Sequence, residues 1–174
     1  GYRFMPAYRN RVWDGKIRLY NQTTGQIPAG LFPQILSFAE SREYELEVEE
    51  TEYGNPNEGN SINVDFMMKF IEALKLPFDI RAYQFDAVCH GIQHRNAILL
   101  SPTGSGKSLI IFVLMRWLLS AFDKKRKDVL IIVPTTSLVE QMYTDFKNYG
   151  YDVERLCHRI YSGKDKNSFK RVVI

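Results

Sequence analysis

Gly104, Gly106, Lys107 and Ser108 are the residues whose types and spacing best fit chemistry on a phosphate group. Residues 97–100 before them form a short apolar run typical of a buried strand, and a strongly apolar helical segment follows. Glycines let backbone N–H groups point into the loop, and the helix start adds the positive end of its dipole. We expect the Lys107 ammonium to reach the β- and γ-phosphates of a nucleotide and the Ser108 hydroxyl to bind Mg²⁺.

One departure from the usual pattern leaves an alternative open for this loop. A glycine normally stands six positions before the lysine, where this chain has Ser101. A glycine-rich turn also packs a helix onto a strand without binding a ligand. Because Gly104 still supplies a tight turn, the phosphate-binding interpretation is favoured.

Length and composition predict one ordinary domain, or one domain with a small appendage. The chain has 174 residues, of which 45% are hydrophobic and 25% charged, as in globular proteins. Its longest apolar run, residues 109–115, is far shorter than the ~18 residues that span a membrane, so no membrane partner is expected. The two cysteines are far apart and lack metal-ligand spacing, which indicates a reduced, intracellular protein.

Charge is segregated along the chain although the net charge is only +3. Residues 1–20 hold five basic residues and one acidic residue, whereas residues 40–60 hold eight glutamates and one arginine. Basic residues prevail again in residues 147–171. This pattern favours one face for a polyanion and another that avoids it, with ordinary solvated faces as the alternative.

Residues 1–60 are predicted to form a small α+β unit. Alternating side chains indicate strands at residues 16–20 and 44–48, and helical spacing indicates a helix at residues 31–38. The polar, turn-rich residues 53–59 mark the boundary to the next domain. Aromatic residues among the first arginines fit either base stacking beside phosphate contacts or the core of a minimal domain.

Residues 61–174 alternate predicted helices with apolar strands. A helix capped by Asn63 is expected to end at Pro77, and a further helix is expected to start at residues 134–137. The other expected elements are helices at residues 81–93 and 108–122 and strands at residues 97–100, 129–133 and 172–174. The basic run at residues 123–128 is expected to be an exposed loop. The βαβ order predicts an α/β domain with a parallel sheet.

Three segments, in this order, resemble the first RecA-like lobe of superfamily-two helicases. They are Ile80-Arg81-Ala-Tyr83-Gln84, the loop Ser101-Pro-Thr-Gly-Ser-Gly-Lys-Ser, and Val133-Pro-Thr-Thr-Ser-Leu-Val-Glu-Gln. They correspond to an adenine-recognition segment, motif one and motif one-a. The resemblance covers about residues 62–174 and implies a RecA-like parallel sheet with a P-loop, here as a partial lobe.

The resemblance implies roles at the matched positions. Gln84 is implied to read the adenine edge, because its amide both donates and accepts, and Arg81 to contact the base or ribose. Thr135 and Thr136 are implied to hold nucleic-acid phosphates. Without the other motifs, Gln84 reads as an exposed helix glutamine and the threonines as a simple helix cap. The implied nucleotide contacts of the loop are Pro102, Thr103, Gly104, Ser105, Gly106, Lys107 and Ser108, the last two catalytic and Ser108 also on Mg²⁺.

The start of the chain resembles a second part of such proteins. The opening Tyr-Arg-Phe-x-Pro and the stretch at residues 13–19 are similar to the amino-terminal domain of phage recombination helicases. This resemblance implies that residues 1–60 are a DNA-binding accessory domain. The implied nucleic-acid contacts are Arg9, Arg11, Lys16 and Arg18.

Together these resemblances imply a fragment of an ATP-dependent DNA helicase or translocase that acts on branched or duplex DNA in recombination or repair. ATP and Mg²⁺ are the implied cofactors. Catalysis in this superfamily also needs an Asp-Glu pair on the next strand and arginines from a second RecA-like lobe, and the sequence contains neither. We expect a monomer in the cytoplasm of a bacterial or phage-infected host.

Two alternatives remain at this point. One is a motor that moves along duplex DNA without separating the strands, as restriction-type translocases do. The other is a nucleotide-binding or phosphoryl-transfer protein of another class that uses the same loop and has no need of the cations in residues 1–20.

Overall fold

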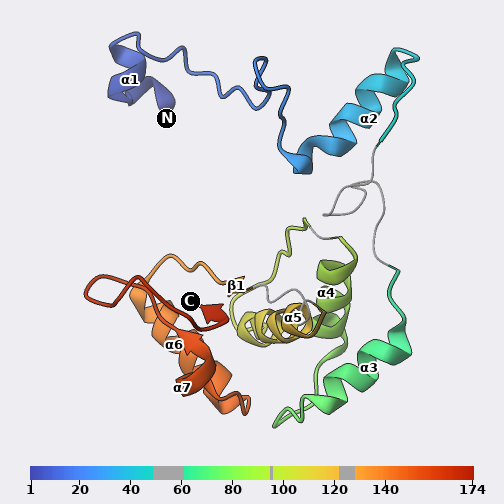
Figure 1. Cartoon of the computed structure of the whole chain (residues 1–174), viewed down its shortest axis with the longest axis vertical. Helices are drawn as coiled ribbons and strands as arrows, with labels where there is room; N and C mark the ends of the chain where they lie inside the picture. The colour runs from blue at the N-terminus through green and yellow to red at the C-terminus, as the bar shows by residue number, and fades with distance from the viewer. Residues whose placement is uncertain (49–60, 95, 122–127) are drawn as a thin grey trace. The chain divides into compact units, whose positions relative to one another are not determined.

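A computed structural model describes residues 1–48, 61–94, 96–121 and 128–174 of the chain (Figure 1). The chain divides into two compact units, Gly1–Glu58 and Gly59–Ile174. The predicted boundary at residues 53–59 and most of the predicted loop at residues 123–128 lie outside the described residues.

The first unit contains short helices and an aromatic cluster. Its elements are η1 (Tyr2–Phe4), α1 (Pro6–Arg9), η2 (Ala29–Leu31) and α2 (Phe32–Ser41), the last close to the predicted helix. The Tyr2 ring meets the rings of Tyr8 and Trp13 edge-on, at centroid distances of 5.1 and 6.2 Å. Gly15 turns the chain beneath this cluster with φ +79°, and an added Cβ would lie 2.7 Å from the Tyr2 ring. The aromatic residues therefore pack on one another in a small cluster.

The strands predicted in the first unit are wrong. Residues 16–20 and 44–48 are extended or irregular, and Ile17 and Leu19, which a strand would have buried on one face, are 79% and 50% exposed. An alternating pattern forms a strand only when a neighbouring strand completes the ladder, and the described residues of this unit offer none. Within residues 1–48 only Ala39 is buried.

The second unit holds five helices among its described residues. They are α3 (Val64–Ala73), α4 (Ala82–Gln93), α5 (Lys107–Ala121), α6 (Thr136–Asn148) and α7 (Val153–Leu156). Asn63 caps α3 as predicted, since its side-chain oxygen accepts a hydrogen bond from the Phe66 N–H at 3.0 Å. The helix ends at Ala73, earlier than Pro77, and Lys75 then takes a positive φ of 52°.

A parallel sheet confirms the predicted α/β class. Its strands are β1 (Val129–Leu130), β2 (Cys157–His158) and β3 (Val172–Val173), in the order β1-β3-β2. Val172 stands opposite Val129 on one side and Cys157 on the other. The sequence reasoning had missed β2, because its two residues carry no extended apolar or alternating run.

Two of the strand predictions in this unit need correction. Residues 97–100 form no strand, and β1 covers only two of the five residues predicted at 129–133. The side chains of Ile98 and Leu100 are 89% and 96% exposed, and that of Ile132 is 83% exposed. The described residues place no strand beside 97–100, so this segment lacks the ladder partner that a parallel strand requires.

Helix α5 forms the centre of the core, as its apolar surface on all sides predicts. Phe112, Val113 and Met115 are buried, and the Phe112 ring lies 5.2 Å from that of Phe146 in α6. Helix α5 also packs against α4 and β1 (Figure 1). No helix in the described parts of the chain is long and apolar enough to cross a membrane. The buried α5 gives the loop at residues 101–106 a rigid base.

Candidate nucleotide site

The loop before α5 has the backbone that a phosphate cradle needs. Gly104 and Gly106 take φ values of +80° and +79°, in the left-handed region that favours glycine. The Gly106 carbonyl accepts hydrogen bonds from the Leu109 and Ile110 N–H groups at 3.0 and 3.3 Å, which starts α5. A Cβ at position 106 would lie 2.4 Å from Nε2 of Gln84, so any side chain there would force Gln84 or the loop to shift.

Two side chains of helix α4 form hydrogen bonds to this loop. The Ser105 carbonyl accepts two hydrogen bonds, one from the Tyr83 hydroxyl and one from Gln84 Nε2, each at 2.9 Å. The hydroxyl of Ser105 contacts that of Ser101 across the loop. Ser101, which replaces the usual glycine, therefore helps to close the loop.

Gln84 is a buried connection between α4 and the loop. It is 6% exposed, and its Oε1 accepts a hydrogen bond from the Arg81 backbone N–H at 3.0 Å, which completes the start of α4. An amide offers two hydrogens and two lone pairs, so one donor and one acceptor position remain for a ligand. Arg81 itself is exposed at the N-cap of α4.

The Lys107 ammonium lies at the mouth of the loop. Its Nζ donates to the carbonyls of Ser101 and Pro102 at 3.2 and 2.8 Å, and the residue is exposed. Backbone carbonyls are weaker partners for an ammonium than a phosphate oxygen, because only the phosphate carries a full negative charge. Thr103, also exposed, continues the rim of the loop.

Ser108 is half-buried and contacts a residue that the sequence reasoning had not considered. Its Oγ lies 2.9 Å from the hydroxyl of Tyr149, 41 positions away, which caps the C-terminal end of α6. Burial, more than any other influence, raises the pKa of Tyr149, so the phenol is neutral at physiological pH.

The donor set fits a nucleotide with Mg²⁺. Left-handed glycines, an ammonium and a serine hydroxyl supply backbone N–H groups, one positive charge and one hard oxygen ligand. The described residues contain no group of three or more His, Cys, Asp or Glu side chains that could hold a metal ion. At this loop, Ser108 Oγ would offer Mg²⁺ a hard oxygen ligand.

The two threonines implied to contact nucleic acid stand at the start of α6. Thr135 is its N-cap, since Oγ1 accepts a hydrogen bond from the Leu138 N–H at 3.3 Å, and Thr136 is its first residue. Both are exposed. The helix-cap role is thus realised, and the exposed position leaves the start of the helix open to a ligand.

The four basic residues implied to contact DNA lie in the first unit, and all are exposed. Arg18 is paired with Asp14, through Nη2 and Oδ2 at 2.6 Å. The pairing lowers the pKa of the Asp14 carboxyl, chiefly through the hydrogen bond from Arg18. Arg9, Arg11 and Lys16 form no ion pair with any residue that the structure describes.

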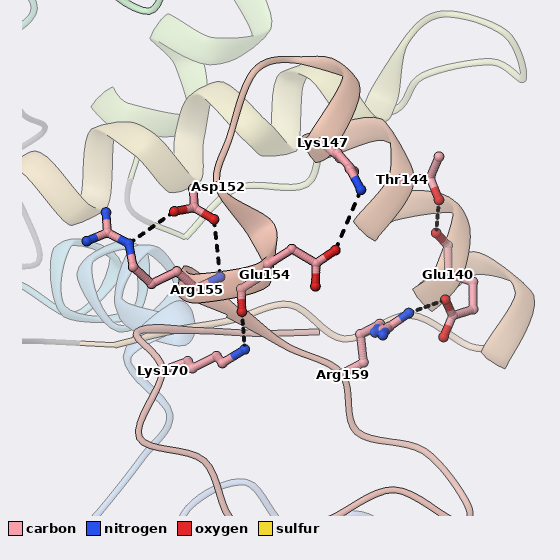
Figure 2. Close-up of polar contacts among 8 residues, drawn as sticks. All are labelled: Glu140, Thr144, Lys147, Asp152, Glu154, Arg155, Arg159 and Lys170. Carbon is pink, nitrogen blue, oxygen red and sulfur yellow. Dashed lines mark hydrogen bonds and ion pairs between the residues drawn. The ribbon is translucent and has the colours of Figure 1, made fainter.

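Several basic side chains of residues 147–171 form ion pairs and hydrogen bonds within the protein (Figure 2). Glu140 in α6 accepts a hydrogen bond from Arg159 at 2.5 Å, and Lys147 pairs with Glu154 at 3.6 Å. Lys170 donates to the Glu154 carbonyl at 2.6 Å. These contacts tie α6 and α7 to the segments around the sheet, which is a structural role for charges that the sequence assigned to a polyanion face.

The glycine-rich loop stands at the start of the buried helix α5, is hydrogen-bonded to Gln84 of α4, and belongs to the unit that holds the parallel sheet. This arrangement is expected of a helicase ATP-binding lobe. The sequence pattern of the DEAD/DEAH box helicases matches residues 81–173, and the chain belongs to this family. The resemblance inferred from the three sequence segments is therefore confirmed. A second pattern, that of the N-terminal part of the DNA helicase UvsW, matches residues 1–49.

Individual relatives agree with this assignment. The chain is 34% identical to the ATP-dependent DNA helicase uvsW of Enterobacteria phage T4, over 96% of this chain and 33% of that protein. A probable ATP-dependent RNA helicase of Mycoplasma pneumoniae is 36% identical over 65 residues, which is 37% of this chain and 14% of that protein. A crystal structure of the UvsW helicase from bacteriophage T4 matches with a TM-score of 0.80 and 32% identity, over 99% of this chain and 62% of that one. The chain thus spans about a third of the phage relative's length.

Two contacts of the site were missed by sequence reasoning. Tyr83 stands beside Gln84 in the recognised segment, but nothing in that segment says that its hydroxyl reaches the loop. Tyr149 lies far from Ser108 in the sequence, and only the packing of α6 against α5 brings the two hydroxyls together.

Proposed function

We propose that this chain is part of an ATP-dependent DNA helicase that acts on branched or duplex DNA in recombination or repair. The observation that carries the proposal is the hydrogen bond from Gln84 to the Ser105 carbonyl, which joins the adenine-recognition segment to the P-loop in a member of this family. ATP and Mg²⁺ are the cofactors that this site would take. The phage relative that matches nearly the whole chain is an ATP-dependent DNA helicase.

In this proposal each loop residue has a defined task. Lys107 leaves the Ser101 and Pro102 carbonyls and neutralises charge on the β- and γ-phosphates. Ser108 would hold Mg²⁺ through Oγ, and the ion would supply positive charge that offsets the charge developing on the phosphate. The backbone N–H groups of Gly104, Ser105 and Gly106 hold phosphates, with Pro102 and Thr103 at the rim. Gln84 uses its remaining donor and acceptor on adenine, beside Arg81.

We propose a separate role for each of the two parts of the chain. Residues 61–174 form the N-terminal part of the ATP-binding lobe, and residues 1–60 form an accessory domain that grips DNA through Arg9, Arg11, Lys16 and Arg18. Thr135 and Thr136 hold the sugar–phosphate backbone at the lobe itself. Hydrolysis further requires an Asp-Glu pair and the arginines of a second RecA-like lobe. We propose that the complete protein acts as a monomer in the cytoplasm of a bacterial or phage-infected host.

Reversing the charge of three cations, as Arg9→Glu, Arg11→Glu and Lys16→Glu, should weaken DNA binding by the complete protein. The slope of log K against log salt is negative, and each lost phosphate contact makes it shallower by about 0.9, so the loss of three contacts makes it shallower by roughly 3. Fluorescence anisotropy of a labelled branched DNA at several salt concentrations measures both quantities. The matched control is Lys69→Glu on α3, an exposed cation with no proposed DNA contact, which should leave the slope unchanged.

Two results would count against this assignment. Unchanged DNA affinity in the triple variant would remove residues 1–20 from the DNA interface. In a strand-displacement assay on branched DNA, we expect strand separation that depends on ATP. ATP turnover without strand separation would instead favour movement along duplex DNA.

A further inference from the structure

The hydroxyl of Tyr149 is placed to act on the proposed Mg²⁺ ligand. Its oxygen lies 2.9 Å from Ser108 Oγ, and the two residues come from the end of α6 and the start of α5. We propose that Tyr149 is a positioning residue: it accepts the hydroxyl hydrogen of Ser108 and thereby turns a lone pair of Ser108 toward Mg²⁺. The inference rests on the proposed nucleotide-binding function of the loop.

The ring of Tyr149 is held on two sides, so its hydroxyl has a defined position. The Phe78 ring meets it edge-on at 5.6 Å with an interplanar angle of 88°. The Phe112 ring, from the buried face of α5, meets it at 5.3 Å and 60°. Because Phe112 and Ser108 are one turn apart on α5, the contact that holds the ring and the contact of its hydroxyl share one rigid element.

Hydroxyl chemistry determines how this contact works. Serine has one O–H hydrogen and two lone pairs, and a metal ligand gives one lone pair to the cation. A cation on Ser108 Oγ makes the O–H a stronger donor, which favours the direction from Ser108 to Tyr149. Partners of this kind fix the orientation of a metal ligand, and their loss commonly costs 10- to 100-fold in metal affinity.

Tyr149→Phe removes this acceptor and keeps the ring. In the complete protein, binding of a fluorescent ATP analogue is titrated with Mg²⁺ and also measured in EDTA. We expect the Mg²⁺ concentration that gives half of the maximal increase in binding of the ATP analogue to rise about tenfold. The affinity for the analogue in EDTA should be unchanged. The matched control is Tyr151→Phe, because the Tyr151 ring packs on Phe112 at 5.8 Å while its hydroxyl does not contact Ser108. That control should keep the normal Mg²⁺ midpoint.

The outcomes separate the positioning role from a structural role and from the proposed function itself. An unchanged Mg²⁺ midpoint in Tyr149→Phe overturns the inference. An equal loss of binding with Mg²⁺ and in EDTA also overturns it, since it shows that the hydroxyl serves only the fold. If the unaltered protein shows no Mg²⁺-dependent ATP binding, the proposed function fails first, whatever Tyr149→Phe does.

Discussion

Lys107→Ala should lower ATP turnover in the complete protein by about 10²–10³ and leave its fold intact. Lys107 is exposed, and its Nζ donates hydrogen bonds to the carbonyls of Ser101 and Pro102, so its loss should remove little buried packing. In a nucleotide complex the same ammonium offsets charge on the transferred phosphate, and removing one such group costs about 10²–10³ in turnover. Steady-state phosphate release measures the turnover, and chemical unfolding measures the stability, which should stay within about 0.5 kcal/mol of the unaltered protein.

A second lysine serves as the comparison for this experiment. Lys69→Ala, on the exposed side of α3, removes the same side chain from a position outside the proposed site and should leave turnover and stability unchanged. A Lys107→Ala protein that unfolds, or that still turns over ATP at the normal rate, would mean that the glycine-rich loop is a packing turn.

Gly106→Ala should prevent nucleotide binding and destabilise the second unit. The added Cβ would lie 2.4 Å from Gln84 Nε2, and the backbone φ of +79° adds strain of about 1–2 kcal/mol for a residue with a side chain. Either Gln84 moves and releases the Ser105 carbonyl, or the loop shifts away from α4. Nucleotide affinity and the free energy of unfolding both report the change.

Gly104→Ala separates strain from collision. Gly104 has nearly the same φ, +80°, but an added Cβ there meets no atom within 4 Å. It should therefore lose less stability than Gly106→Ala. In a protein that already carries Gln84→Ala, the Gly106→Ala change should cost less stability than it does in the unaltered protein, because the colliding amide is gone. Equal losses at both glycines would contradict the contact between Gly106 and Gln84.

Local sequence patterns predicted the longer helices and the backbone conformation of the glycine-rich loop well. Asn63 and Thr135 act as the N-caps that their side chains favour, and the apolar surface of α5 on all sides matches its buried position. Gly104 and Gly106 have the positive φ values that the loop pattern implies. Each of these features depends on residues within a few positions of one another, so it can be predicted from the sequence alone.

Features that depend on distant residues were not predictable in the same way. Strands require a neighbour, and the apolar run at residues 97–100 has no described strand beside it, which leaves Ile98 and Leu100 exposed. The strand prediction for residues 16–20 is wrong for the same reason. The contact between Ser108 and Tyr149 depends on how α6 packs against α5, and no local pattern encodes that packing.

The dependence of ATP turnover on DNA, measured in the complete protein with and without branched DNA, tests the account most directly. A P-loop tied to Gln84, on a lobe whose α6 begins with two exposed threonines, predicts that turnover rises sharply when DNA is added. Turnover that is the same without DNA would contradict the assignment of this site to a DNA-driven motor.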